Sequence, residues 1–125
     1  MVGFKFEKLV VYQKAIDFID KIYLLTKGYP NDEMFGLTSQ LRRSAVSISL
    51  NIAEGSARPK KDFRRFLDIA RGSVYECVAV LRISFKQNYI NKSKFEELKE
   101  YLAEISKMLS GLKRSLAPQT MNNEQ

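Results

Sequence analysis

Apolar and polar residues alternate along the chain with the spacing of amphipathic helices. Apolar positions recur three and four residues apart, which places them on one side of a helix with 3.6 residues per turn. The pattern covers four stretches, about residues 9–27, 33–54, 60–88 and 93–116, with short breaks between them. We therefore predict four helices.

The first two breaks contain residues that stop and start helices. Gly28 followed by Pro30 predicts the end of the first helix. Asn31 and Asp32 are typical N-cap residues and predict the start of the second helix. Gly55 predicts the end of that helix.

The third and fourth helices have similar boundary signals. Pro59 suits the first position of the third helix or the residues just before it. Asn91 or Ser93 caps the fourth helix, and Pro118 ends it. Gly72 lies inside the third helix, where it either permits the close approach of another backbone or is simply tolerated.

Connections of only a few residues favour helices that are antiparallel neighbours. We predict an all-α fold, an antiparallel up-down-up-down four-helix bundle. One domain covers residues 1–117, and residues 118–125 form a polar tail that we expect to be disordered.

The second helix has a second apolar line besides its core side. An isolated bundle needs one apolar face per helix, so two faces indicate burial against another helix or against a neighbouring subunit. Arg42 and Arg43 lie beside this line, where they can bind phosphate or pair with acids across a subunit contact. The predicted oligomer interface comprises Phe35, Arg42, Arg43, Val46, Leu50 and Ala53.

The charge of the chain is basic and localised. The formal net charge is +7 and the isoelectric point is about 9.6. Residues 58–90 contain eight Lys and Arg against three Asp and Glu. A localised basic excess is typical of proteins that bind nucleic acid, although a solvated charged face has the same composition.

The third helix places cations and a tyrosine on the side opposite its apolar face. Cations at its N-terminal end oppose the helix dipole, which favours an anionic ligand there. Phosphate contacts would give affinity without reading sequence, and Tyr75 and Tyr89 can stack on unpaired bases. The predicted nucleic-acid-binding residues are Arg58, Lys60, Lys61, Arg64, Arg65, Arg71, Tyr75, Arg82 and Lys86.

The sequence offers little for catalysis. It contains no histidine, and no phosphate-cradling glycine loop is present. The acidic residues of the second and third helices do not share one helix face. We therefore expect no enzymatic activity, no metal and no cofactor. Asn51 and Glu54 form either a ligand site or a structural polar network to a basic residue of the third helix; we favour the network.

The remaining signals concern location. Cys77 is the single cysteine, and we expect an inert thiol on the apolar face. We find no signal peptide and no apolar stretch long enough to span a membrane. We therefore expect a cytoplasmic protein.

Four stretches of the chain match a known family pattern. They are Leu9–Ala15 (LVVYQKA), Gly36–Ile48 (GLTSQLRRSAVSI), Asn51–Gly55 (NIAEG) and Phe66–Glu76 (FLDIARGSVYE). With them the chain resembles the small four-helix-bundle proteins encoded within intervening sequences of bacterial 23S rRNA genes, which also bear the name of a ribosomal protein. This family is similar to the accessory variability protein of diversity-generating retroelements.

The second resemblance has implications for partners. The accessory variability protein is a homopentamer with a basic surface that binds nucleic acid and a reverse transcriptase. The resemblance therefore implies a homo-oligomeric ring of five subunits, with a reverse transcriptase as a candidate protein partner. We predict a non-catalytic protein that binds RNA or DNA with little sequence preference. The alternative is a protein–protein adaptor or scaffold with no role in nucleic-acid binding.

Overall fold

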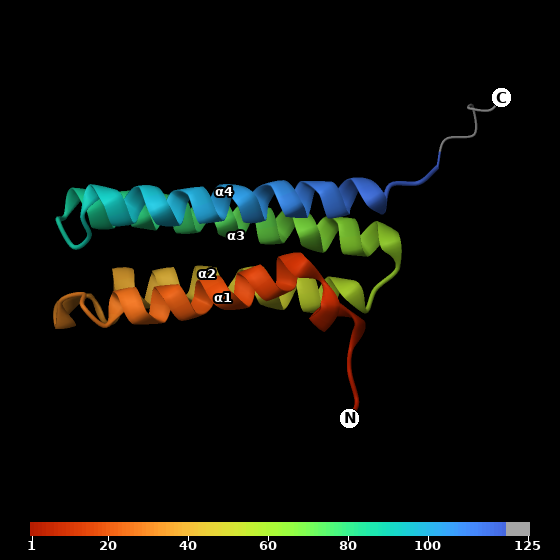
Figure 1. Ribbon diagram of the computed structural model, residues 1–125, viewed down its shortest axis with the longest axis horizontal. Coiled ribbons are helices and arrows are strands. Elements are labelled where there is room, and N and C mark those ends of the chain that lie inside the picture. Colours follow the sequence, from red (N-terminus) through yellow and green to blue (C-terminus); the bar gives the residue numbers. More distant parts are fainter. Residues whose placement is uncertain (120–125) are drawn as a thin grey trace.

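Four α helices form the described part of the protein, and the chain reverses direction at each connection (Figure 1). The computed structural model describes residues 1–119, and within this range no β-strand is present. Two short 3-10 helices precede α1 and α2, respectively. The all-α fold with four antiparallel helices is therefore confirmed. The elements are η1 Lys5–Lys8, α1 Val10–Thr26, η2 Asn31–Glu33, α2 Leu37–Ser56, α3 Lys60–Lys86 and α4 Lys92–Ser115.

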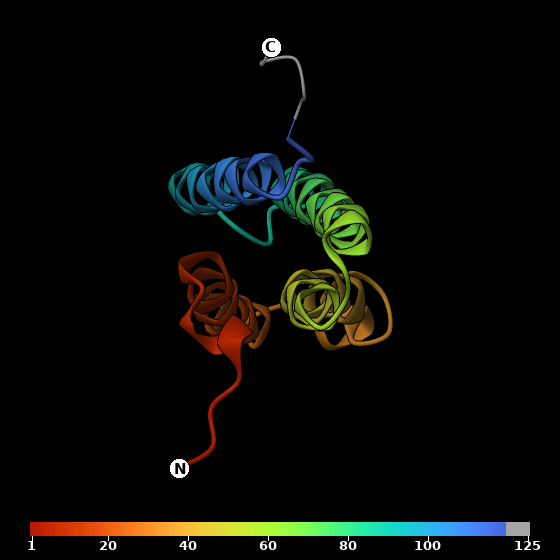
Figure 2. The ribbon, with the colours of Figure 1, turned by 90° about the vertical axis from the view of Figure 1, so that its right-hand side faces the viewer.

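The helices are arranged as two layers of two. Helices α1 and α2 form one layer and α3 and α4 form the other, so that each helix occupies one corner when the bundle is viewed along its length (Figure 2). Each helix packs on two others, and the pair α2 and α3 forms the most extensive contact between layers. The core lies between the layers, and its largest fully buried residues include Phe18, Ile22, Leu41, Ile48, Leu67, Leu81, Leu102 and Ile105.

The start of α2 differs from the prediction. Asn31 and Asp32 do not cap this helix, because they lie in η2, and α2 begins only at Leu37. The cap comes instead from Glu33, whose Oε1 accepts a hydrogen bond of 3.0 Å from the backbone N–H of Leu37. A carboxylate at this position also interacts favourably with the positive end of the helix dipole.

Gly55 does not terminate α2 as predicted. The residue is buried within the last turn of the helix, which continues to Ser56. A Cβ atom at Gly55 would lie 2.7 Å from Cβ of Phe66 and 2.8 Å from Cδ1 of Phe63. The missing side chain therefore permits α3 to pack closely on α2.

Gly72 has a different environment. A Cβ atom there would meet no heavy atom within 4 Å, so Gly72 is not required for a close approach within the chain. The N-cap of α4 is Asn91, whose Oδ1 accepts a 2.8 Å hydrogen bond from the backbone of Lys94. The helix ends at Ser115, before Pro118, and most of the predicted tail lies outside the described residues.

Cys77 is fully buried on the core side of α3, as predicted. Burial raises the pKa of its thiol to about 12, which leaves almost no thiolate at neutral pH. Cys77 is therefore a packing residue.

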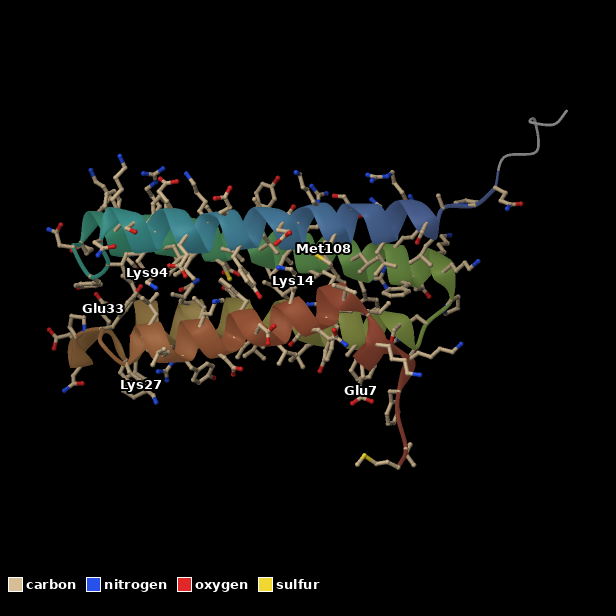
Figure 3. The ribbon with its side chains drawn as sticks, viewed as in Figure 1. Glu7, Lys14, Lys27, Glu33, Lys94 and Met108 are labelled. Carbon is tan, nitrogen blue, oxygen red and sulfur yellow. The ribbon has the colours of Figure 1, made fainter. Side chains whose placement is uncertain are left out.

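An ion pair connects α1 and α4 across the layers. Nζ of Lys14 lies 2.7 Å from Oε1 of Glu104, and Lys14 extends from α1 toward the α3–α4 layer (Figure 3). The same ammonium lies 4.4 Å from the ring centroid of Tyr101. The hydrogen bond from Lys14 lowers the pKa of the Glu104 carboxyl.

Candidate nucleic-acid interface

An apolar groove runs along the outer side of α3 and α4, where the two helices meet. Apolar side chains of both helices form its floor, and several of them are small, so the floor is accessible between the two helices. Tyr75 stands at its α3 edge and is 64% exposed. The residues that line the groove are Val74, Tyr75, Val78, Ala79, Lys99, Leu102, Ala103, Ser106 and Lys107.

Two lysines of α4, Lys99 and Lys107, border this groove, and neither is among the nucleic-acid-binding residues predicted from the sequence. Lys99 also forms a local ion pair, because its Nζ lies 3.7 Å from Glu96, but both lysines line the groove. The antiparallel pairing of α3 with α4 would have predicted this position, because it places both lysines across the groove from Tyr75.

Lys99 of the groove also lies over the ring of Phe95, which is outside the groove lining. This ring is 1% exposed and stacks on Phe85 with a centroid distance of 5.4 Å. The guanidinium carbon of Arg82 lies 4.7 Å from the centroid of Phe95, and Nζ of Lys99 lies 5.1 Å from it. Cation–π contacts of this kind hold a cation in place while its N–H groups stay available to a phosphate.

Further along the contact between α3 and α4, the basic side chains of α3 are less exposed. Nε of Arg64 donates a 3.3 Å hydrogen bond to the backbone carbonyl of Lys113. Lys113 in turn pairs with Asp68 at 2.9 Å. Arg71 is half-buried, and its Nε is buried without a hydrogen-bond partner among the described residues.

The predicted nucleic-acid-binding residues of α3 therefore differ in exposure. Arg64 and Arg71 are half-buried at the contact with α4, although they lie on the side of α3 that the sequence places opposite its apolar face. Tyr75, Arg82 and Lys86 are exposed. Among residues 1–119, no carboxylate oxygen lies within 4.0 Å of the guanidinium nitrogens of Arg64, Arg71 or Arg82.

Two arginines near the α2–α3 connection lie over the aromatic ring of Phe66. The guanidinium carbons of Arg58 and Arg65 lie 5.4 and 5.1 Å from the ring centroid of Phe66. Arg58 also pairs with Glu54 at 2.9 Å, so its charge is partly neutralised. Lys60 and Lys61 are exposed at the start of α3, with Arg64 beside the same hollow.

Tyr89 is not available for base stacking. Its hydroxyl donates a 3.0 Å hydrogen bond to Oε2 of Glu33, and its ring packs against Tyr29 with centroids 5.4 Å apart. This contact joins the α1–α2 connection, where Glu33 lies (Figure 3), to the α3–α4 connection. The role of Tyr89 is structural.

The predicted polar network connects α2 to α3 through serines. Asn51 donates hydrogen bonds to the carbonyl and the hydroxyl of Ser47, and the Ser47 hydroxyl accepts a 2.9 Å bond from Ser73 of α3. No basic residue of α3 takes part in these bonds. Glu54 is outside this network, because it is exposed and bonds to Arg58.

The residues of the predicted oligomer interface also differ in exposure. Phe35 is 96% exposed and Leu50 is 61% exposed. Arg42 belongs to the α1–α2 contact, because its Nε donates to Oγ1 of Thr26 at 2.8 Å and its guanidinium lies 4.4 Å from the ring centroid of Tyr23. The remaining members are Arg43, which is exposed, and Val46 and Ala53, which are half-buried.

Within the described part of the chain, no three His, Cys, Asp or Glu side chains come together in a way that could hold a metal ion. No helix of residues 1–119 combines the length and apolar character needed to cross a bilayer.

Comparison with known proteins identifies the family. The family model of the 23S rRNA-intervening sequence protein matches residues 7–111. The chain belongs to this family. A crystal structure of a protein of unknown function from the S23 ribosomal protein family of Bacteroides thetaiotaomicron superposes with a TM-score of 0.77. The two chains are 29% identical over 84% of this chain and 96% of the other. No curated protein matches.

Proposed function

We propose that this member of the 23S rRNA-intervening sequence protein family is a non-catalytic protein that binds single-stranded RNA or DNA along the groove between α3 and α4. The observation that supports the proposal is the combination of an apolar floor, an exposed tyrosine of α3 and two lysines of α4, with Arg82 of α3 on the same phenylalanine ring as Lys99. Aromatic and apolar surfaces accept unpaired bases, and flanking cations accept phosphates.

The chemistry of the groove implies little sequence preference. Stacking on Tyr75 is open to every base, because every base has a π face. The cations Arg82, Lys99 and Lys107 contact the phosphate backbone in this proposal, and the backbone is the same in all sequences. Exposed Lys60 and Lys61 extend the positive field toward the α2–α3 connection.

The experiment compares two charge reversals of equal size. A groove variant, Arg82→Glu with Lys107→Glu, and a control variant, Lys5→Glu with Lys8→Glu on η1, change the net charge by the same amount. Fluorescence anisotropy of a labelled single-stranded RNA gives the Kd of each. We expect the groove variant to lose at least about tenfold in affinity and the control variant to change much less.

Salt dependence adds a second readout. Each phosphate contact on a single strand contributes roughly 0.7 to the slope of log K against log salt concentration. The groove variant should therefore lower that slope by about 1.4, which the control variant should not do. No binding of the wild-type protein at low salt, or equal losses in both variants, would contradict the proposal.

A protein-binding role is the second candidate. The apolar floor of the groove, with its small residues Ala79 and Ala103, also fits an amphipathic helix of a protein partner. Partner capture from cells that survives nuclease treatment and is lost in Ala103→Glu, combined with no affinity of the pure protein for RNA, would favour this function.

We also propose that the protein assembles as a homo-oligomeric ring, with five subunits as the expected number. The exposed apolar residues of the α1–α2 layer support assembly, because monomeric proteins rarely expose large apolar side chains in one region. A ring would repeat the basic groove around its symmetry axis and increase avidity for a long polyanion.

A further inference from the structure

Three exposed residues lie along one side of α1, and an acidic residue stands between two apolar ones. Val10 is 59% exposed and Leu24 is 72% exposed, and exposed Asp17 lies midway between them. A spacing of seven residues keeps the three side chains on one side of the helix, with steps of about 10 Å along its axis. We call Val10, Asp17 and Leu24 the α1 line.

Helix α2 has a matching line of opposite charge. Phe35, just before the first turn, is 96% exposed and Leu50 is 61% exposed. Arg43 lies between them: it lines one hollow with Phe35 and the next with Leu50. We call Phe35, Arg43 and Leu50 the α2 line.

The two central charges lack partners within the chain. Among residues 1–119, no Lys or Arg nitrogen lies within 4.0 Å of the Asp17 carboxylate, and no carboxylate oxygen lies that close to the Arg43 guanidinium. Asp20 adds a second acid one turn from Asp17. Lys14 and Lys21 flank Asp17 on α1, but Lys14 pairs with Glu104 and Nζ of Lys21 lies over the ring of Tyr101, while Lys27 lies at the far end of α1 (Figure 3).

We propose that the α1 line of one copy packs against the α2 line of the next copy. Asp17 then pairs with Arg43 in the centre, and apolar residues meet on both sides of this pair. The contact is heterologous, since each copy contributes a different surface, and such a contact forms rings when its rotation closes. Both lines belong to the α1–α2 layer, so the groove of α3 and α4 stays open to solvent.

This inference rests on the proposed assembly but can fail separately from it. Sedimentation velocity first gives the mass of the wild-type protein, which should be five times the chain mass of 14.4 kDa for the proposed ring. A monomeric wild type would overturn both the assembly and the inference.

Two blocking variants test the contact itself. Leu24→Asp blocks the α1 line, and Phe35→Asp blocks the α2 line. Both residues are largely exposed, so the helical fold should survive, as circular dichroism would verify. Each variant alone should be monomeric, and a mixture of the two should form a one-to-one heterodimer through the single intact junction.

The mixture distinguishes the heterologous contact from a symmetric one. If α2 packed on α2 of a second copy, Leu24→Asp alone would still assemble and the mixture would gain nothing. An oligomer that persists in Leu24→Asp or in Phe35→Asp, or a mixture that stays monomeric, would overturn the inference. Ala103→Asp on α4, where the native residue is exposed and lines the groove of α3 and α4, is the control outside both lines and should assemble like the wild type.

The central pair has its own test. Asp17→Arg and Arg43→Asp should each weaken assembly, and the double variant should restore it toward the wild type. Failure of the double variant to assemble better than both single variants would show that Asp17 and Arg43 do not meet.

Discussion

At the scale of single residues, the most informative position for the fold is Gly55. A Cβ atom there would lie within 2.8 Å of two phenylalanine side chains of α3, and one of these atoms is the Cβ of Phe66, which moves only with its backbone. Gly55→Ala should therefore force the two helices apart and destabilise the protein by about 1–3 kcal/mol. Denaturant unfolding measures this free energy.

Gly72→Ala provides the matched control within the same bundle. The added methyl group meets no atom within 4 Å, and alanine favours the helical state over glycine by up to about 1 kcal/mol. This variant should be at least as stable as the wild type. If Gly55→Ala were also as stable as the wild type, the close α2–α3 contact at this residue would be wrong.

Residue types alone could not distinguish these two glycines. Gly55 follows an apolar helix and has the position of a C-terminal cap, whereas its actual role depends on Phe63 and Phe66, which pack against it from α3. The same limit applies to Tyr75 and Tyr89. Both are tyrosines near a basic helix, but a hydrogen bond to Glu33 keeps Tyr89 inside the structure.

At the scale of helices, the sequence predicts most of the architecture. The period of apolar residues places the four helices within a few residues of their observed bounds, because burial of one face dominates helix formation in a bundle. The start of α2 is the main exception. Asn31 and Asp32 had suitable side chains for a cap, but the chain forms η2 there and Glu33 supplies the hydrogen bond to Leu37.

The candidate site was only half predictable, since it lies between two helices. The periodicity of α3 identified Tyr75 and Arg82, which are on its exposed side. Lys99 and Lys107 belong to α4, and their relation to Tyr75 depends on which helices are neighbours. Conversely, Arg64 and Arg71 share the helical face of Arg82, yet they are half-buried at the contact with α4.

The contact between α1 and α4 gives a prediction about acid stability. The pKa of the Glu104 carboxyl is lower in the folded protein than its ordinary value, because Lys14 donates a hydrogen bond to it. The pair therefore stabilises the fold above the pKa of the unfolded carboxyl, and this contribution disappears as the pH falls through the folded pKa. The unfolding temperature should fall on acidification, and it should fall less in Glu104→Gln.

Lys14→Met should reduce the acid dependence in the same way, since it removes the other partner of the pair. The effect should be modest because the pair is solvent-exposed. Thermal unfolding followed by circular dichroism from neutral pH downward measures it. An acid dependence in Glu104→Gln as steep as in the wild type would show that the pair does not contribute.

At the scale of the whole molecule, the two layers differ in what they expose. The α3–α4 layer presents the groove with its cations, and the α1–α2 layer presents lines of exposed apolar residues with single charges between them. This division suits a protein that uses one layer for assembly and the other for a polyanion. A reverse transcriptase as partner stays a prediction from the resemblance.

The central claim is that single-stranded nucleic acid lies in the groove between α3 and α4. Photo-cross-linking of wild-type protein to a single-stranded RNA, followed by mass spectrometry of the cross-linked peptides, locates the contact directly. We predict cross-links at Tyr75 and in the α4 peptide that contains Lys99 and Lys107. Cross-links confined to peptides of α1 and α2, or no cross-links at all under binding conditions, would contradict the claim.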